Sequence, residues 1–415
     1  MTYTLQGPGR LDATIDLPAS KSISNRALII NALAGNEICP TNLSDCDDTR
    51  VIVAALSAMP DVIDIGAAGT AMRFLTALLA IGSGEHTITG TARMKQRPIA
   101  TLVDALRYMG ADIRYLGEEG FPPLRIKGRH LDGGRLEIAG NISSQYVSAL
   151  LMIAPMLKNG LELKLTGEIA SRPYIDLTLW TMSEYGAVAE WTDVDTIRVE
   201  PKPYSSRNYM IESDWSAASY WYEIMALSSF RDARIRLTGL HDGSRQGDSV
   251  AKYIFSLLGV KTVFEPSGND GRSVVRLTHH RTKLPRLEYD FFSSPDLAQT
   301  FVVTCGMMGI PFHFHGLASL KIKETDRIEA LKAEMRKLGI VLTSIDDTQL
   351  IWDGTRCEPT LEPIETYNDH RMALAFAPAA FVFPGLKIRN PEVVSKSYPR
   401  FWDDIRKAGF IINEE

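Results

Sequence analysis

Cysteine is scarce in this sequence of 415 residues, which contains only Cys39, Cys46, Cys305 and Cys357. These residues form no CxxC pair, and their spacing to histidine is not that of a metal site. A chain of this length also needs no disulfides to hold its core together. We therefore expect reduced thiols in a cytoplasmic protein and no metal centre.

An excess of positive charge is absent as well. The 45 lysine and arginine residues are outnumbered by 50 aspartate and glutamate residues, which leaves a formal net charge of −5. Without a general basic field, a protein cannot hold nucleic acid by releasing counterions. Any site for an anion must therefore be built locally from a few side chains.

Long apolar runs are missing too. The longest apolar stretches are interrupted by Arg, Gly or Pro before they reach the roughly 18 residues that a membrane span requires. The first twenty residues lack a basic stretch followed by an apolar run. The sequence thus predicts neither membrane insertion nor secretion.

The composition is that of a folded globular protein, with 45% hydrophobic and 23% charged residues. At roughly 150 residues per domain, a chain of this length is too long for one ordinary core. We therefore expect two to three domains.

A repeated pattern is present along most of the chain. Five segments have the apolar periodicity of an amphipathic helix, end in glycine and continue with strand-like residues. The glycine spacing of 70 to 80 residues follows from the positions Gly110, Gly186, Gly259, Gly339 and Gly409. A glycine at this point suits a left-handed helix C-cap.

A second set of segments alternates with the first. Each opens with small or polar residues and continues as an almost wholly apolar helix, which is typical of a buried helix. The six segments are 20–34, 68–80, 143–155, 214–227, 294–307 and 368–381. The repeating unit is therefore a buried helix, a strand, an amphipathic helix and two further strands.

Six such units nearly exhaust the chain, and we divide them three and three with a boundary near Ile211. The first unit is shorter than the others. Pro60 stands where the closing glycine is expected, and the next buried helix opens at Gly69. Relative to the other units, roughly 20 residues of strand are missing.

The openings of the buried helices carry residues suited to anions, because the first backbone N–H groups of a helix have no internal partners. The residues at the first three openings are Lys21, Ser22 and Arg26, then Gly69 and Thr70, then Ser143, Ser144 and Gln145. Simple N-capping is the alternative explanation for each opening.

Arginine also stands at or beside helix starts, at Arg97, Arg327 and Arg371. Its charge opposes the helix dipole there, so the fold alone would favour Asp or Glu. Arginine binds carboxylate or phosphate through two planar contacts, which makes these residues candidate ligands. The alternative is a solvated surface arginine, and Lys323 and Lys396 are weaker candidates of the same kind.

Eight motifs occur in one order across nearly the whole chain: SKSISNR, GTAMRF, RMKQRPI, SSQY, SRPYIDLT, SPDLA, KETDRI and YNDHRMA. In these motifs the sequence resembles the 5-enolpyruvylshikimate-3-phosphate synthase (3-phosphoshikimate 1-carboxyvinyltransferase) family. The resemblance implies an α/β fold of two globules, each of three βαβαββ repeats around buried parallel helices, an inside-out α/β barrel. The first repeat would be shortened, which agrees with the repeat pattern above.

The resemblance also implies the domain organisation. The N-terminal globule would comprise residues 20–211, and the C-terminal globule residues 1–19 together with 212–415. In the family, the helix N-termini of both globules face the cleft between them.

Members of the family transfer the enolpyruvyl group of phosphoenolpyruvate to the 5-hydroxyl of 3-phosphoshikimate and release phosphate, in the pathway to chorismate and aromatic amino acids. By resemblance, the ligands of 3-phosphoshikimate would be Lys21, Ser22, Arg26, Ser143, Ser144, Ser171, Tyr174, Asp296, Ser319 and Lys323. The ligands of phosphoenolpyruvate would be Lys21, Gly69, Arg97, Gln145, Arg327, Arg371 and Lys396.

The resemblance assigns chemical roles as well. Asp296 is similar to the family's general base, and either Glu324 or Lys21 would donate the proton to the methylene carbon. The expected partners are small anionic substrates, with no nucleic acid and no membrane. No metal or organic cofactor is called for, and a monomer is the default expectation.

The sequence departs from the family pattern at three places. Ser319 stands where the family commonly has an asparagine that binds the shikimate phosphate. Ala67 and Phe74 replace the usual asparagine and proline around Gly69. The short first repeat is the third departure, and it bears on efficiency more than on the type of reaction.

Two other functions are possible. UDP-N-acetylglucosamine enolpyruvyl transferase shares the fold and the donor, but SKSISNR and SSQY match the shikimate-type acceptor site, and no cysteine stands in a matching cleft loop. A shortened homologue could instead bind without turnover. Lys21, Asp296, Glu324 and Arg371 argue against that alternative, because a binder needs no acid and base together.

Overall fold

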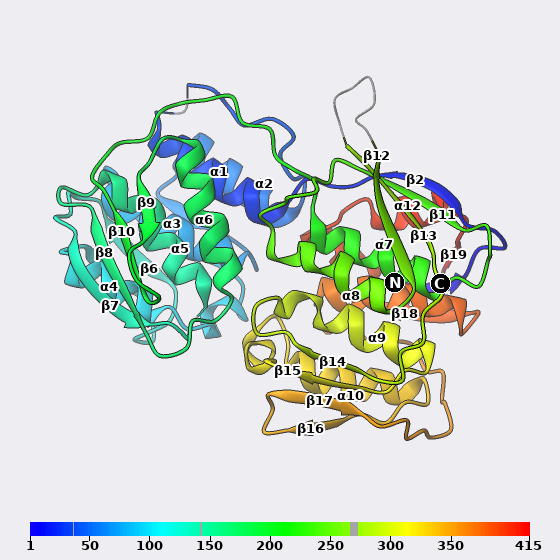
Figure 1. Cartoon of the computed structure of the whole chain (residues 1–415). Helices are drawn as coiled ribbons and strands as arrows, with labels where there is room; N and C mark the ends of the chain where they lie inside the picture. Colours follow the sequence, from blue (N-terminus) through cyan, green and yellow to red (C-terminus); the bar gives the residue numbers. More distant parts are fainter. Residues whose placement is uncertain (36, 142, 266–272) are drawn as a thin grey trace. The chain divides into compact units, whose positions relative to one another are not determined.

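The computed structural model describes residues 1–35, 37–141, 143–265 and 273–415. The chain forms two compact units, which are considered separately below (Figure 1). The N-terminal unit is Ala19–Ile211. The C-terminal unit combines Met1–Pro18 with Glu212–Glu415.

The N-terminal unit contains two four-stranded sheets, in the orders β3-β4-β6-β5 and β7-β8-β10-β9. In both, the first two strands are parallel and the remaining neighbours are antiparallel. Its elements are α1 (Lys21–Leu33), α2 (Asp47–Ala58), β3 (Val62–Asp64), α3 (Gly69–Ile81), β4 (Glu85–Thr89), η1 (Met94–Gln96), α4 (Ala100–Tyr108), β5 (Asp112–Tyr115), β6 (Leu124–Lys127), β7 (Gly134–Ala139), α5 (Ser144–Ile153), η2 (Ala154–Met156), β8 (Leu161–Thr166), α6 (Arg172–Glu184), β9 (Ala189–Trp191) and β10 (Thr196–Val199).

The buried helices predicted from the sequence form the core of this unit. Helices α1, α3 and α5 contact one another. Almost every residue of α3 from Gly69 to Ala80 is buried, which is the environment expected for a helix that is apolar all round. Helices α4 and α6 are the second helices of their repeats. The predicted βαβαββ repeat is therefore confirmed.

The short first repeat is confirmed as well. Helices α1 and α2 are followed directly by β3, which pairs with β4 and so belongs to the second repeat. Within the described residues, the first repeat contributes no sheet of its own, only an isolated bridge between Thr41 and Met210. The core of this unit is thus covered by two sheets and by helix α2.

The C-terminal unit contains two four-stranded sheets, β12-β13-β11-β2 and β14-β15-β17-β16, and a three-stranded sheet, β18-β1-β19. Its elements are β1 (Thr2–Gln6), β2 (Asp12–Asp16), α7 (Trp215–Leu227), β11 (Arg234–Thr238), η3 (Gly247–Val250), α8 (Ala251–Leu257), β12 (Val260–Glu265), β13 (Val274–His279), β14 (Leu287–Asp290), η4 (Pro295–Leu297), α9 (Ala298–Met308), β15 (Phe312–His315), η5 (Ala318–Ile322), α10 (Arg327–Lys337), β16 (Thr343–Ile345), β17 (Gln349–Trp352), α11 (His370–Phe376), η6 (Ala377–Phe381), β18 (Leu386–Arg389), η7 (Pro391–Lys396), α12 (Phe401–Lys407) and β19 (Ile411–Glu414).

Two strands from the start of the chain complete sheets formed by its second half. Strand β2 pairs in parallel with β11 (Figure 1). Strand β1 lies between β18 and β19. The fourth repeat thus takes its first strand from a segment about 200 residues earlier in the sequence. Buried helices α7, α9 and α11 pack inside, with α9 in contact with the other two.

The five glycines predicted to end the amphipathic helices all have positive φ angles, from 79° at Gly339 to 104° at Gly110. This left-handed conformation is the one expected for a helix C-cap, so the prediction is confirmed. In the first repeat the same conformation is taken by Met59, just before Pro60. A side chain is strained there, which marks this helix end as different from the other five.

All four cysteines are free, as predicted. In the part of the chain that the structure describes, no helix combines the length and hydropathy needed to cross a membrane.

One carboxylic acid lies inside the helical core of the C-terminal unit. Glu223 of α7 is completely buried. Within the described residues, neither of its oxygens has a hydrogen-bond partner of good geometry. Burial raises the pKa of Glu223 well above its ordinary value, and the nearby Thr304 hydroxyl only partly offsets this. The folded protein therefore holds this group as a neutral acid.

The buried acid predicts a pH-dependent stability. Because the pKa of Glu223 is higher in the folded than in the unfolded state, its ionisation destabilises the fold as the pH rises above the unfolded pKa. Glu223→Gln cannot ionise, so near pH 8 its free energy of unfolding should exceed that of the wild type. Near pH 4 the two should be about equal. Urea unfolding at both pH values checks this, and an equal difference at both would contradict it.

Candidate active site

A buried ion pair forms the centre of the candidate site in the C-terminal unit. Arg327, the first residue of α10, donates from Nε to Asp369 Oδ2 at 2.6 Å and from Nη2 to Asp369 Oδ1 at 3.2 Å. Their side chains are 2% and 0% exposed. Asp369 is also the N-cap of α11, where its Oδ1 accepts from the Arg371 backbone N–H at 2.9 Å. This pair fixes the start of α10 against the start of α11.

Asp296 lies between Arg327 and Arg371, two of the three arginines predicted at helix starts. Its Oδ1 accepts from Arg327 Nη1 at 3.2 Å, and its Oδ2 lies 2.8 Å from Arg371 Nη2. Lys323 Nζ is 3.9 Å from Asp296 Oδ1. Asp296 is itself 22% exposed, so a predicted base and two predicted donor ligands are in direct contact at an accessible position.

Glu324 joins the same cluster. Its Oε2 accepts from Arg327 Nη2 at 3.0 Å and its Oε1 from Lys396 Nζ at 2.7 Å. Lys396, which the sequence gave only weak grounds to choose, is thereby linked to Arg327 through one carboxylate. Six predicted residues of this unit, Asp296, Lys323, Glu324, Arg327, Arg371 and Lys396, thus form one connected group.

Charge balance explains why arginine is stable at these helix starts. Burial opposes the charge of Arg327, but Asp369, Glu324 and Asp296 outweigh burial and raise the pKa of its guanidinium. The unfavourable interaction with the helix dipole is therefore offset by neighbouring carboxylates rather than by solvent. Tyr220 accepts from Arg371 Nη1 at 3.1 Å, and burial raises the pKa of Tyr220 to about 12.

A further carboxyl group, Asp248, lies in η3 close to this cluster. Burial and the negative charge of Asp296 raise the pKa of Asp248 to about 6, although Arg371 and the hydrogen bond from Ser216 act in the other direction. The Ser216 hydroxyl donates to Asp248 Oδ2. The cluster thus borders a group whose charge changes in the physiological pH range.

In the N-terminal unit, the buried Arg26 forms a second centre. It donates to Thr178 Oγ1 at 2.7 Å, to Ser148 Oγ at 3.1 Å and to the Tyr174 carbonyl at 3.2 Å. These acceptors belong to α5 and α6 and are all neutral. Burial lowers the pKa of Arg26 to about 10. A buried cation held by neutral oxygens is well suited to attract an anion.

Phe74, one of the departures from the family pattern, contacts this cation. Its ring is completely buried, and the Arg26 guanidinium lies 5.5 Å from the ring centroid. The sequence placed Phe74 near the donor ligands, whereas the structure places it against a predicted acceptor ligand. The contact supplies a cation–π interaction.

Lys21 is the first residue of α1, and its Nζ lies 3.2 Å from Asp48 Oδ2. The two side chains are 18% and 5% exposed. Asp48 lies in the first turn of α2, so the second helix of the shortened repeat still positions a predicted catalytic lysine.

The starts of α3 and α5 are linked to each other. Gln145 Nε2 donates to Thr70 Oγ1 at 3.3 Å. Gly69, the first residue of α3, is so close to Arg97 that a Cβ there would lie 2.7 Å from the guanidinium Nη1. Three predicted donor ligands, Gly69, Gln145 and Arg97, therefore lie at two neighbouring helix starts. Arg73 supports them, because it donates to the Gly69 and Pro98 carbonyls at 3.1 and 3.0 Å.

Gly69→Ala should disturb this arrangement without unfolding it. The added methyl group meets the far end of the flexible Arg97 side chain, which can move away at little cost to stability. The moved guanidinium would no longer fit the anion that the resemblance assigns to Arg97, so the KM for the expected donor, phosphoenolpyruvate, should rise roughly 10-fold with little change in Tm. Steady-state kinetics and thermal unfolding check this. An unchanged KM would mean that Arg97 does not contact the donor.

The remaining predicted residues lie at other helix starts. Ser143 is the N-cap of α5 and accepts from the Gln145 N–H at 3.4 Å, and Ser144 begins that helix. Ser171 precedes α6 with a left-handed φ of 54°, and Tyr174 lies in the first turn. Ser319 is half-buried in η5. Ser143 therefore acts as an N-cap, which is the alternative to anion binding that the sequence left open.

Sequence reasoning missed several partners of these residues. Asp369 lies inside YNDHRMA but received no role, although its position beside Arg371 could have suggested an N-cap. Ser148 and Thr178 lie within or close to the SSQY and SRPYIDLT motifs but received no role. Asp48 and Asp248 lie in segments without a chemical signal, since their importance depends on tertiary contacts.

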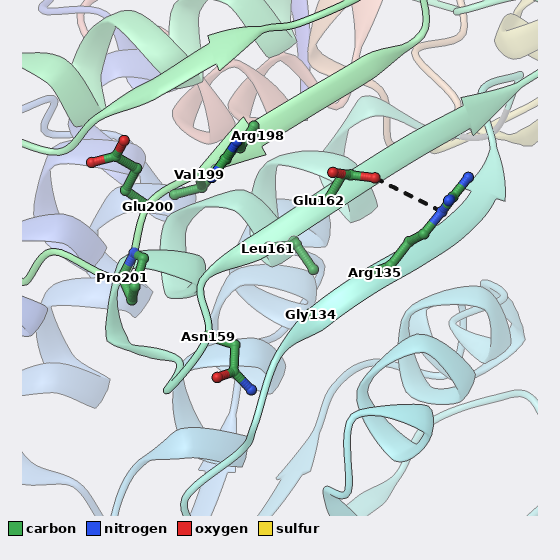
Figure 2. Close-up of a pocket in the computed structure, with 9 residues that line it drawn as sticks. All are labelled: Gly134, Arg135, Asn159, Leu161, Glu162, Arg198, Val199, Glu200 and Pro201. Atoms are coloured by element: carbon green, nitrogen blue, oxygen red, sulfur yellow. Dashed lines mark ion pairs between the residues drawn. The ribbon is translucent and has the colours of Figure 1, made fainter.

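A cavity of about 330 Å³ lies elsewhere, on the sheet formed by β7, β8 and β10. Figure 2 shows Arg135, Glu162 and Arg198 on its neighbouring strands, with the Arg135–Glu162 ion pair at 3.8 Å. None of the predicted site residues lines this cavity. Its charged row is consistent with cross-strand pairing on a solvated face.

Comparison with known proteins identifies the family. The sequence model described as EPSP synthase (3-phosphoshikimate 1-carboxyvinyltransferase) matches residues 5–61 and 57–405. The chain belongs to the EPSP synthase family. It is 59% identical over 411 residues to the 3-phosphoshikimate 1-carboxyvinyltransferase of Bacteroides fragilis, covering 99% of this chain and 98% of the relative. The family resemblance inferred from the eight motifs is confirmed.

More distant relatives agree. The 3-phosphoshikimate 1-carboxyvinyltransferase of Shewanella halifaxensis is 35% identical, with 95% of this chain and 96% of the relative covered. Among solved structures, EPSP synthase from Acinetobacter baumannii matches with a TM-score of 0.77 at 20% identity over all of both chains. An enolpyruvyl transferase from Streptomyces tendae matches with a TM-score of 0.72 at 19% identity, covering 99% of this chain and 98% of that one. These structures support the inside-out α/β fold.

Proposed function

We propose that this EPSP synthase family member transfers the enolpyruvyl group of phosphoenolpyruvate to the 5-hydroxyl of 3-phosphoshikimate, releasing phosphate. The observation that carries the proposal is the Asp296 carboxylate, which lies between Arg327 and Arg371 at the starts of two helices. A base beside two guanidinium groups matches a reaction between a hydroxyl and a small anion. The full-length family match supplies the substrates.

The acceptor would bind through its phosphate, carboxylate and hydroxyl groups. Arg26 offers a buried positive charge, and its neutral partners leave that charge available to the phosphate. The other acceptor ligands that we assign are Lys21, Ser22, Ser143, Ser144, Ser171, Tyr174, Asp296, Ser319 and Lys323.

The donor carries a carboxylate and a phosphate, and three arginines and two lysines are among the residues that we assign to it. Arg327 and Arg371 would bind the carboxylate in place of their present contacts with Asp296, because a guanidinium can bind a carboxylate through two planar contacts. The other donor ligands that we assign are Lys21, Gly69, Arg97, Gln145 and Lys396.

The chemistry is an addition followed by an elimination. Asp296 would take the proton of the acceptor hydroxyl while the hydroxyl oxygen forms a bond to the enol carbon of phosphoenolpyruvate. Glu324 or Lys21 would protonate the methylene carbon, which gives a tetrahedral intermediate that carries phosphate. Loss of a methyl proton and departure of phosphate then restore the double bond. The neighbouring cations stabilise the charge that develops on the phosphate.

The proposal is tested by incubating the purified protein with both substrates and measuring phosphate release and product mass. We expect phosphate and the enolpyruvyl ether in equal amounts, and neither when one substrate is omitted. Turnover of UDP-N-acetylglucosamine in place of 3-phosphoshikimate would assign the related transferase activity. Binding of 3-phosphoshikimate without turnover of any acceptor would identify a non-catalytic homologue, and either result would overturn the proposal.

Asp296→Asn should separate binding from catalysis. Asparagine keeps the shape and some of the hydrogen bonding of Asp296 but cannot act as a base, so turnover should fall on the order of 100-fold or more. Acceptor binding, measured by calorimetric titration, should persist. Near-normal turnover in this variant would remove Asp296 from the role of general base.

We also propose that the enzyme acts as a monomer in the cytoplasm. The free cysteines are consistent with a reducing compartment. Analytical ultracentrifugation measures the oligomeric state directly.

A further inference from the structure

Glu334 on α10 is completely buried, and both of its carboxylate oxygens accept hydrogen bonds. Its Oε1 accepts from the Tyr367 hydroxyl at 2.7 Å. Its Oε2 accepts from Lys337 Nζ at 2.7 Å and from the Glu365 backbone N–H at 3.0 Å. Two of these three donors belong to the segment 363–369, which leads directly into α11.

Lys337 strengthens the same attachment. While its ammonium group contacts Glu334, it also donates to the Pro363 carbonyl at 3.0 Å. Lys337 and Glu334 together therefore hold the segment at Pro363, Glu365 and Tyr367. Burial and the hydrogen bond to Glu334 raise the pKa of Tyr367, so its hydroxyl keeps the proton that it donates.

The 363–369 segment needs such support because its backbone is strained. Tyr367 and Asn368 are consecutive residues with left-handed φ angles of 53° and 54°. Asparagine tolerates this conformation, but it is unfavourable for a bulky residue such as Tyr367 and persists there only where the surroundings impose it. The strained pair stands immediately before Asp369, the partner of Arg327.

Helix α10 therefore binds the 363–369 segment at two points. Arg327 binds Asp369, and Glu334, seven residues later, binds Tyr367 and Glu365. Residues seven apart lie on one face of a helix, about 10 Å apart along its axis. One face of α10 thus determines where the segment ends and where α11 begins.

We propose that Glu334 is a positioning residue that sets the placement of Asp369 and Arg371 by holding the 363–369 segment on α10. The effect reaches the reacting groups through Arg371, whose Nη2 lies 2.8 Å from Asp296 Oδ2. The proposal rests on the donor-binding role proposed above for Arg371. The hydrogen-bond partners of Glu334 are Lys337, Glu365 and Tyr367, none of which is assigned to a substrate. Replacing Glu334 would therefore act on the reaction through the geometry of the site.

The test is Glu334→Gln, compared with Glu329→Gln as a matched control. Glutamine has the size of glutamate but cannot accept from all three donors, whereas Glu329 on the same helix forms only an exposed pair with Lys332. We expect Glu334→Gln to lower kcat/KM for phosphoenolpyruvate on the order of 10-fold or more, because small displacements of positioned groups are costly. The acceptor Kd should change less than about twofold, and Glu329→Gln should behave as the wild type.

Tyr367→Phe provides a second, milder variant, since it removes one of the three donors and leaves the other two. Its kcat/KM for phosphoenolpyruvate should lie between those of the wild type and Glu334→Gln. If Glu334→Gln does not fold, Tyr367→Phe decides the question. Unchanged donor kinetics in the folded variants, or an equal loss of donor and acceptor affinity, would overturn the proposal.

Hydrogen exchange distinguishes this proposal from the proposed reaction. In Glu334→Gln, the backbone amides of Asp369 and Arg371 should exchange faster than in the wild type, whatever the substrate. A wild-type protein without turnover would contradict the proposed function, and the exchange rates would still decide the role of Glu334. Unchanged exchange at these two amides would overturn that role.

Discussion

The buried pair between Arg327 and Asp369 is the interaction on which the candidate site depends. A guanidinium that is only 2% exposed must be neutralised, and Asp369 does so with two hydrogen bonds. Removing one partner would leave a buried charge uncompensated, which is among the most destabilising changes available to a protein. The same pair aligns two helix starts, so the requirement for charge balance also fixes the geometry of the site.

The two units use different electrostatic solutions. In the C-terminal unit, Asp296 and Glu324 are each shared between two or more cations. In the N-terminal unit, Arg26 is held by hydroxyl and carbonyl oxygens. The first arrangement suits the proton transfer that we propose for Asp296, whereas the second suits the phosphate binding that we propose for Arg26.

Much of the fold could be predicted because its signals are local. The apolar helices, the glycines with left-handed φ and the shortened first repeat all follow from the order of residues along the chain. Arg327 and Arg371 could be predicted because an arginine at a helix start is locally unfavourable. Lys21 could be predicted because it stands at the opening of a buried helix, where backbone N–H groups can bind an anion.

The partners of these residues could not be predicted in the same way. Asp48, Asp369 and Glu334 act through contacts between segments up to about 40 residues apart, and an aspartate or glutamate in a helix is usually a solvated residue. The strained pair Tyr367 and Asn368 gives no glycine signal. From the sequence, Phe74 could be placed only by its closeness to Gly69, a predicted donor ligand. Its contact with Arg26 arises from packing between helices and could not be predicted.

The central claim is that the arginines at the starts of α10 and α11 bind the donor. The most direct test is Arg371→Lys, which keeps the charge but loses the planar two-point contact. The account predicts that the kcat/KM for phosphoenolpyruvate falls roughly 10-fold, while the calorimetric Kd of 3-phosphoshikimate alone stays nearly constant. If acceptor binding weakened as much as the donor parameter, Arg371 would support the site as a whole, and the donor assignment would be wrong.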